Sequence, residues 1–258
     1  DELKNAGKFD EAIAAYKELI EKFPGTESAA EGLMSIGNLN VERAGKMASN
    51  PKNLSPEKQK DWNDLIQKAQ DSYEEILKNE KYSSFSTIDK ALSELSNLWQ
   101  RKISAGFSAK NDATEYFKKI APESNLSLHV KASFSLGSLL SLLGDKEEAL
   151  KTISSAYEKA KEAKDKEISL PNSGYEQYRS LLFDNHQADK IIEVSERQLE
   201  EKDKSGDGKG SAEALLGLGR VCFEKDDSAK AGEYLNQIIA KYPWHPTAAS
   251  DAQYYLIW

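Results

Sequence analysis

Residues 214–243 contain two short runs in which apolar side chains recur at the spacing of an α-helix. In the first run, apolar or small residues fall at i, i+3, i+4 and i+7, on one face of a helix with a 3.6-residue period. They are Leu215, Leu218, Gly219 and Cys222. In the second run, Ala231, Leu235 and Ile238 form the corresponding face. Pro243 ends the second helix, because proline lacks a backbone donor and its ring clashes with the preceding turn.

Gly219 and Ala231 are small residues at the points where these two helices are expected to touch. Two antiparallel helices approach closely only where neither presents a bulky side chain. A large residue at either position should overpack the pair and cost ~1–3 kcal/mol. The sequence therefore predicts a close antiparallel helix pair.

The same pattern returns along the rest of the chain. A second clear copy covers 132–161, with Gly137 and Ala149 as its small residues. The remaining copies are halves at 7–24 and 246–258, and degenerate copies at 27–79, 84–121 and 173–203.

Two of the degenerate copies have features that the clear copies lack. Met47 to Ser55 is a polar insertion, longer than a tight turn, and Ser55 with Pro56 then predicts the start of a new helix. Tyr175 and Tyr178 open the last degenerate copy. Either core packing or an exposed ligand platform would explain these two aromatic residues.

The spacing resembles the tetratricopeptide repeat (TPR), whose pattern is Trp-x2-Leu-Gly-x2-Tyr, then Ala-x3-Phe, then Pro over 34 residues. Leu215 and Cys222 replace the Trp and the Tyr and are still apolar. The segments PheProGlyThrGluSerAlaAla (23–30) and TyrProTrpHisProThrAlaAla (242–249) resemble a TPR variety of bacterial cell-envelope proteins, such as outer-membrane assembly lipoproteins and the Tol-Pal coordinator protein. The resemblance implies an all-α fold, an α-solenoid of about six antiparallel helix pairs that form one right-handed superhelix over 1–258.

Composition narrows the classes of function. The formal charge of −8 and the pI near 5.2 argue against a nucleic-acid surface, which requires clustered Lys and Arg. The single cysteine, Cys222, lies among leucines, as a core thiol would. No run approaches the ~18 apolar residues of a membrane span. The chain begins at Asp1, in the middle of the pattern. We therefore expect contact with a membrane only through an anchor that precedes Asp1.

Residues 202–210 imitate a calcium site without completing it. The bidentate carboxylate of an EF-hand loop belongs at position twelve, where this chain has Ala214, and Glu213 lies one residue early. We therefore expect a flexible polar connector and no metal here. The residues that match the first half of the loop are Asp203, Ser205, Asp207 and Gly208.

No other cluster indicates catalysis or a cofactor. The GlyLysGlySer run at 208–211 lacks the glycine spacing and the preceding strand of a phosphate-binding loop. His129, His186 and His245 are far apart and have no cysteine cluster, so we expect surface or capping histidines. No Gly-x-Ser-x-Gly elbow is present. We therefore expect neither an enzyme nor a cofactor, and no small-molecule substrate.

In a TPR stack the first helix of each pair lines a concave groove, and repeat places two, five, nine and twelve face a bound segment. The resemblance therefore implies a groove for a peptide or a partner helix, although the same faces would alternatively only cover neighbouring repeats. A clamp for a C-terminal carboxylate needs Lys at place five, where this chain has Met34 and Ser93, so such a clamp is not expected. The groove places hold Met34, Asn38, Val41, Lys90, Ser93, Asn97, Gln100, Lys131, Phe134, Ser138, Ser141, Leu216, Arg220 and Phe223.

The resemblance implies a non-enzymatic scaffold that binds a protein or peptide partner and no nucleic acid. A periplasmic or cell-envelope location is expected, with the cytoplasm as the alternative. Two other roles stay open: an assembly factor or chaperone for exported or outer-membrane proteins, and a TPR region of a larger enzyme or secretion machine whose chemistry lies elsewhere.

Overall fold

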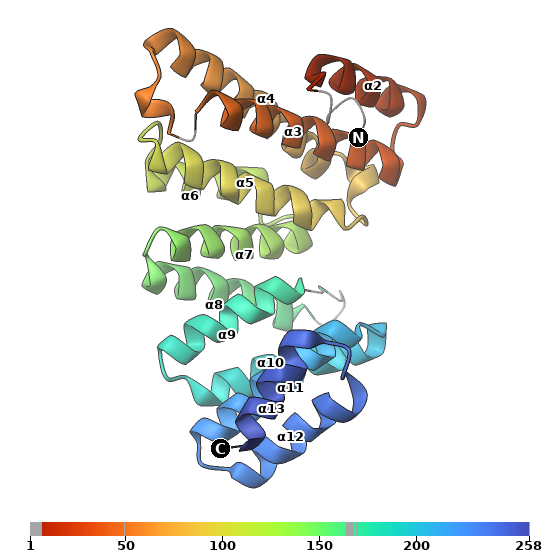
Figure 1. The fold of residues 1–258 in the computed structure, drawn as a ribbon, viewed down its shortest axis with the longest axis vertical. Helices are drawn as coiled ribbons and strands as arrows, with labels where there is room; N and C mark the ends of the chain where they lie inside the picture. The colour runs from red at the N-terminus through yellow and green to blue at the C-terminus, as the bar shows by residue number, and fades with distance from the viewer. Residues whose placement is uncertain (1–6, 49, 164–167, 169, 258) are drawn as a thin grey trace. The chain divides into compact units, whose positions relative to one another are not determined.

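The computed structural model describes residues 7–48, 50–163, 168 and 170–257. These residues form twelve α-helices, two short 3-10 helices and no β-strand (Figure 1). The all-α class and the arrangement in helix pairs, both predicted from the sequence, are therefore confirmed. Trp258, the last residue of the predicted half copy 246–258, lies outside the described residues.

Most helices follow one another through short connections, whereas longer segments, 48–55, 79–86 and 163–171, precede α4, α5 and α9. Their bounds are α2 Phe9–Lys22, α3 Glu27–Met47, η1 Pro51–Asn53, α4 Pro56–Lys78, η2 Glu80–Tyr82, α5 Thr87–Ser104, α6 Lys110–Ile120, α7 Leu126–Leu142, α8 Lys146–Glu162, α9 Asn172–Asp184, α10 Ala188–Ser205, α11 Gly208–Glu224, α12 Ser228–Lys241 and α13 Pro246–Ile257.

Most helices fall inside the copies predicted from the sequence. Two copies are exceptions. In the copy at 214–243 the first helix, α11, already begins at Gly208, and in the copy at 132–161 the first helix, α7, already begins at Leu126. Asn125 caps this helix by accepting a hydrogen bond from the Leu128 N–H at 3.2 Å. The cap lies before the first residue of the TPR-like pattern, so the pattern alone placed the helix start too late.

The chain divides into two compact units, Asp1–Ala160 and Lys161–Trp258. Each unit is a stack of antiparallel helix pairs, the arrangement of an α-solenoid. A single right-handed superhelix running through both units stays a prediction.

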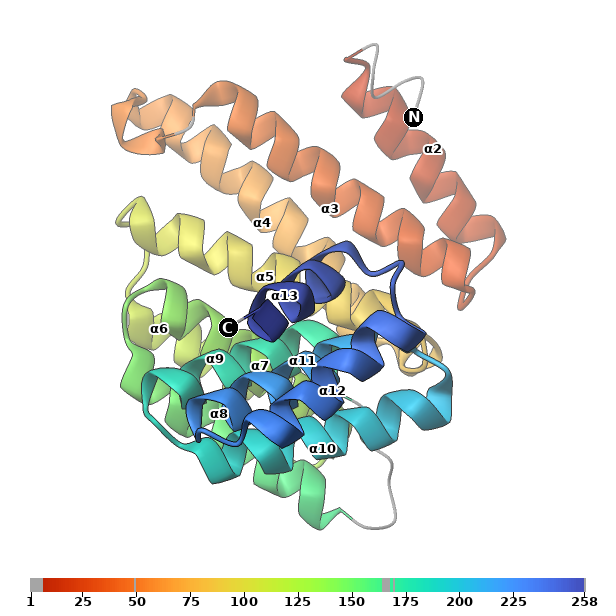
Figure 2. The ribbon, with the colours of Figure 1, turned by 60° about the horizontal axis from the view of Figure 1, so that its bottom comes forward.

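In the first unit, α3 packs against α2 and α4, as Figure 2 shows. The first helices of successive pairs are α3, α5 and α7. They lie in one row, because α5 packs against both α3 and α7. We call α3, α5 and α7 the first-helix row. This row carries all of the groove residues predicted for the first unit.

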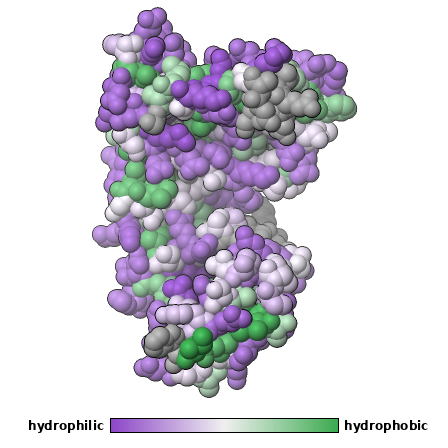
Figure 3. Space-filling model, viewed as in Figure 1, coloured by the Kyte–Doolittle hydropathy of each residue, from purple (hydrophilic) through white to green (hydrophobic). Residues whose placement is uncertain are grey.

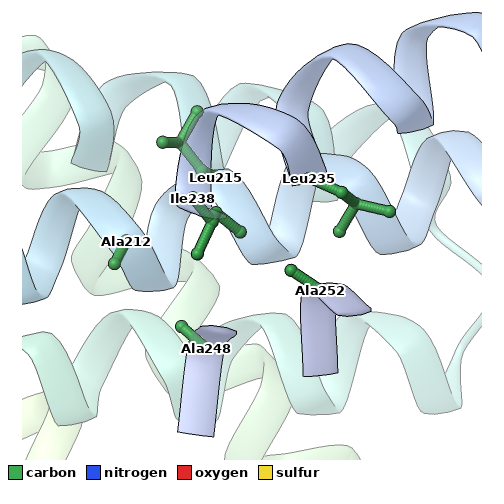
Figure 4. Close-up of a cluster of buried hydrophobic side chains, with 6 residues drawn as sticks. All are labelled: Ala212, Leu215, Leu235, Ile238, Ala248 and Ala252. Carbon is green, nitrogen blue, oxygen red and sulfur yellow. The ribbon is translucent and has the colours of Figure 1, made fainter. Parts of the chain in front are cut away.

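In the second unit, α11 is the central helix and packs against α9, α10, α12 and α13. Part of the core of this unit lies where α11, α12 and α13 meet (Figure 4). Removing these side chains from water stabilises the packing of the three helices by about 25 cal/mol per Å² of apolar surface. The cluster consists of Ala212, Leu215, Leu235, Ile238, Ala248 and Ala252.

The close contact predicted between α11 and α12 is present. A Cβ atom added to Gly219 would lie 2.7 Å from Leu235 Cδ2 and 3.7 Å from the Ala231 carbonyl oxygen. Ala231 itself is only 2% exposed. The leucine of the second helix therefore occupies the space that any side chain at Gly219 would need.

Two helix pairs of the first unit repeat this contact. A Cβ atom on Gly137 would lie 2.3 Å from Ile153 Cγ1, and one on Gly37 would lie 2.3 Å from Tyr73 Cε1. Real Cβ atoms essentially never lie within 3.0 Å of a heavy atom from a residue that is not their chain neighbour. A glycine on the first helix thus faces a large side chain on the second helix in each of these pairs.

The pair α9 and α10 reverses the two sizes. Arg179 stands at the place of Gly219 and Ser195 at the place of Leu235, with the same separation in sequence. The side chain of Arg179 is 5% exposed, and its Nη1 donates a hydrogen bond to Gln198 Oε1. Burial lowers the pKa of the Arg179 guanidinium to about 10, which leaves it charged at neutral pH.

A glycine of the neighbouring helix makes room for this arginine. A Cβ atom on Gly217 of α11 would lie 2.8 Å from both Arg179 Cδ and Ser195 Oγ. The large side chain in this degenerate copy therefore comes from the first helix, and small residues on both adjacent helices accommodate it.

The predicted flexible connector at 202–210 is wrong. α10 continues to Ser205 and α11 begins at Gly208, so only Gly206 and Asp207 lie between them. Gly206 adopts the left-handed conformation with φ 72°, and Asp207 Oδ1 accepts the Gly210 N–H at 3.0 Å. Glycine, serine and aspartate here form helix ends, although their composition is also that of a linker.

We predict that Gly219→Ala lowers the free energy of unfolding by about 1–3 kcal/mol, because the added methyl group overlaps Leu235. The matched control is Gly232→Ala in α12, where an added Cβ meets nothing within 4 Å. The control should gain up to about 1 kcal/mol, since alanine is the better helix former. Urea unfolding of the two variants measures both changes, and equal stability of the two would contradict the contact.

We also predict that Arg179→Gly and Ser195→Leu are non-additive. Each change alone should destabilise the second unit, since the first leaves a cavity and the second overpacks the arginine. Together they recreate the arrangement of Gly219 and Leu235. The double variant should therefore be ~1–2 kcal/mol more stable than the sum of the single effects. A double-mutant cycle by urea unfolding measures this coupling, and strict additivity would show that the two side chains do not share one space.

Candidate peptide-binding surface

The groove prediction is wrong for two residues, because the structure buries both of them. Met34 is 8% exposed and Phe134 is 2% exposed, so neither side chain forms part of an exposed groove face. α3 is covered by α2, α4 and α5. α7 is apolar around most of its circumference, and a helix of this kind is buried on several sides. The place in the repeat thus gave the direction of each side chain, but the neighbouring helices decide its exposure.

The outer face of α5 is exposed along its length. Lys90, Ser93 and Asn97 are exposed and Gln100 is half-buried. Their spacing places these four residues, which we call the α5 strip, on one side of the helix. Asn97 Nδ2 donates to Glu94 Oε2 at 3.4 Å, which is a weak contact within the same helix. The α5 strip therefore combines a cation, a hydroxyl and two amides that the core does not use.

On α3, Asn38 is exposed and Val41 is half-buried. Asn38 Oδ1 accepts a hydrogen bond from the Tyr73 hydroxyl at 2.7 Å. Burial raises the pKa of Tyr73, so the hydroxyl keeps its proton and acts as the donor. Asn38 therefore fixes the tyrosine ring that packs against Gly37, and it belongs to the fold as well as to the surface.

On α7, Lys131 is not a free cation. Its Nζ lies 3.0 Å from Asp89 Oδ1 of α5, and the two side chains are 19% and 33% exposed. The ion pair ties α7 to α5. Ser138 and Ser141 of α7 are half-buried.

The predicted groove residues of the second unit contact neighbouring helices. The Arg220 guanidinium lies 4.8 Å from the centroid of the Phe183 ring on α9. The rings of Phe223 and Tyr255, on α11 and α13, have centroids 5.5 Å apart. Leu216 packs against the core cluster of Figure 4. In this unit the first-helix faces therefore serve mainly to join successive helix pairs.

A pocket of about 250 Å³ that the sequence did not predict lies at the end of the α5 strip. Gln100, Arg101 and Ser104 of α5 line one side of it. Arg101 lies outside the four groove places of the repeat, so the repeat pattern gave no reason to select it. The insertion after α3, noted in the sequence as longer than a tight turn, was the available signal. Asn50 and Pro51 of that insertion, with Trp62 of α4, line the opposite side.

Residues that a catalytic or metal site would use have structural roles. Tyr175 and Tyr178 are 0% and 1% exposed, which confirms core packing over a ligand platform. His245 caps α13, since its Nδ1 accepts the Ala248 N–H at 3.2 Å. Cys222 is buried, and burial raises the pKa of its thiol, which disfavours the reactive thiolate. In the described ranges, no group of three or more His, Cys, Asp or Glu side chains could hold a metal ion.

Hydrophilic residues cover most of the face of the molecule in Figure 3. Within the part of the chain that the structure describes, no helix has both the length and the apolar character needed to cross a bilayer. The fold and the α5 strip therefore define an all-α helical-repeat protein with a polar exposed surface on α5.

Comparison with known proteins supports the TPR type of repeat. The family model for the tetratricopeptide repeat matches residues 3–26 and 213–243. No curated protein matches the chain. The fold is similar to the crystal structure of BtubC (BKLC) from P. vanneervenii, with a TM-score of 0.53 and 16% sequence identity over 90% of this chain and 87% of that chain. At this identity the similarity concerns the fold alone.

We predict that calcium does not change the stability of the protein. The carboxylates of the EF-hand-like stretch are used locally, since Asp207 caps α11 and Asp203 Oδ1 accepts a hydrogen bond from the Ser211 hydroxyl at 2.5 Å. The midpoint of thermal unfolding should be the same with millimolar Ca²⁺ as with a chelator. A rise in the midpoint that Asp203→Asn removes would contradict this assignment.

Proposed function

We propose that the protein is an interaction scaffold that binds a segment of a partner polypeptide along the first-helix row of the first unit. The observation that supports this most directly is the α5 strip. On the opposite face of α5, Leu92, Leu95 and Leu98 are buried in the core. Lys90, Ser93 and Asn97 of the strip are exposed. Exposed polar residues in a row on a helix are suited to recognition, because the backbone that carries them is already ordered before binding.

The chemistry of the α5 strip suits a peptide more than a small molecule or a nucleic acid. Amide and hydroxyl groups can pair with the N–H and C=O groups of an extended main chain, which recur along its length. Drug-sized ligands are held in pockets of about 300–1,000 Å³, whereas the α5 strip is an open helix face. The net charge of −8 opposes a polyanion. TPR repeats in general mediate protein–protein interactions, which supports the same proposal.

The finer roles rest on the Tyr-Pro likeness of the sequence. A place in the bacterial cell envelope, an assembly role for exported proteins and a connection to a larger machine are all proposals. Sequencing the complete reading frame tests them together. A secretion signal or lipid-attachment motif upstream of Asp1 would support the envelope and assembly roles, and a catalytic domain in the same frame would support the third.

The proposed surface can be tested with a displayed random-peptide library selected on the full chain. We expect peptides that bind the wild type to lose at least about tenfold in affinity for the variant Lys90→Ala with Asn97→Ala, the equivalent of about 1.4 kcal/mol. The matched control removes the same residue types from α6, Lys119→Ala with Asn111→Ala, where both side chains are exposed.

The two variants separate the α5 strip from the rest of the surface. Selected peptides should bind the α6 control as tightly as the wild type, as measured by calorimetry. A library that yields no binder, or binders that the α6 control weakens as much as the α5 variant does, would overturn the proposal.

A further inference from the structure

Residues 50–55, between α3 and α4, form a folded wall beside the α5 strip. Asn50 begins the short helix η1 by accepting the Lys52 N–H at 3.1 Å, and Pro51 is buried. Gln59 of α4 holds the end of the insertion, since its Nε2 donates to the Leu54 carbonyl at 3.0 Å. Lys52 also reaches the turn after α5, where a Cβ atom on Gly106 would lie 3.1 Å from its Cε.

This wall and α5 enclose the pocket of about 250 Å³. The pocket has an apolar side formed by Trp62 and Pro51. Both residues are buried, and Trp62 is 3% exposed. The Trp62 ring is itself held by Phe107, with ring centroids 5.6 Å apart. The pocket is smaller than the ~300–1,000 Å³ typical of sites for drug-sized ligands, so it suits one side chain or one chain terminus of a peptide.

The polar side of the pocket has one charge. Arg101 is the only charged side chain among its described lining residues, and none of these residues is a carboxylate. Two other pockets of the first unit differ, since both signs of charge line each of them. One has Asp61 and Asp64 with Arg43, Lys46 and Lys68, and the other has Asp71, Glu74, Glu75 and Glu80 with Lys78 and Lys81.

The N–H donors of Arg101 and Gln100 are not taken up by the fold, although the Arg101 charge acts on the Tyr73 hydroxyl. Across the residues that the structure describes, neither side chain has a hydrogen-bond or ion-pair partner. An arginine presents a rigid fork of N–H donors that matches the two oxygens of a carboxylate. The Gln100 amide and the Ser104 hydroxyl add neutral donors beside it.

We propose that this pocket is a specificity site for one carboxylate-bearing residue of the bound peptide. Arg101 binds the carboxylate, Gln100 and Ser104 donate to it or to the adjoining main chain, and Trp62 and Pro51 contact the apolar part of the residue. The proposal deepens the proposed function and rests on it. Gln100 belongs to both surfaces, so a peptide lying along the α5 strip reaches the pocket at the end of that strip.

The pocket can be tested without knowing the partner, by titrating the full chain with three N-acetylated tripeptides. They are acetyl-Ala-Glu-Ala-amide, acetyl-Ala-Gln-Ala-amide, and acetyl-Ala-Ala-Ala with a free C-terminal carboxylate. Amide and indole NMR signals of Trp62, Gln100 and Ser104 report on binding. We expect at least one carboxylate peptide to give saturable shifts at millimolar concentration, at least about tenfold stronger than the Gln peptide. Which of the two acts identifies the source as a side chain or a chain terminus.

Two variants complete the test. Arg101→Gln should weaken the carboxylate peptide at least about tenfold and leave the Gln peptide unchanged, because it removes the charge and keeps a donor. Lys119→Gln on α6 removes an exposed charge elsewhere and should have no effect. Absent or unsaturable shifts with both carboxylate peptides, equal binding of the Gln peptide, or unchanged binding by Arg101→Gln would overturn the proposal. Failure of the α5 strip is a separate result, because Lys90→Ala with Asn97→Ala leaves the pocket residues intact.

Discussion

A side chain of one helix occupying the space above a small residue of its partner is the contact on which the structure depends. Leu235 lies against Gly219, Ile153 against Gly137 and Tyr73 against Gly37. Because each contact fixes the distance between two helices, it lets a short pair bury a continuous apolar face. A pair bound in this way needs only one face for its partner and another for the next pair. The outer face of a first helix such as α5 is then available for other chemistry.

The pair α9 and α10 shows that complementary size matters more than the identity of the residues. Arg179 and Ser195 exchange the large and small partners, and Gly217 in the next helix accepts the larger volume. The exchange carries an electrostatic cost, since a guanidinium that is 5% exposed retains its charge and shares one hydrogen bond with Gln198. The degenerate appearance of this copy in the sequence is therefore an alternative solution to the same packing constraint.

The sequence predicted the repeating unit well because that unit is local. Apolar period, glycine position and proline stops are all read within about 34 residues, and they located the helix pairs and the contact at Gly219. Exposure was predicted less well, because it depends on helices distant in the chain. Phe134 was placed on the groove by its position in the repeat, yet neighbouring helices cover it. The prediction of a flexible connector at 202–210 failed for another reason, since helix ends and linkers are rich in the same amino acids.

The pocket beside Arg101 was beyond sequence reasoning for a related reason. Its walls come from the insertion, from α4 and from the end of α5, and only the fold of the insertion brings Pro51 next to Trp62. Nothing in the repeat pattern marks Arg101, since its place is neither a core nor a groove position. The repeated helix pairs of such a protein can thus be predicted from the period of its sequence. Features that belong to one chain, such as this pocket, arise where the sequence departs from that period.

The most direct measurement of the central contact is the coupling free energy between Gly219→Ala and Leu235→Ala, obtained by urea unfolding of the two single variants and the double variant. If the two side chains compete for one space, truncating Leu235 should relieve the strain of the added methyl group. The double variant should then be more stable than the sum of the single effects by at least about 1 kcal/mol. Additive effects would contradict the account, because they would mean that the two helices do not meet at this glycine.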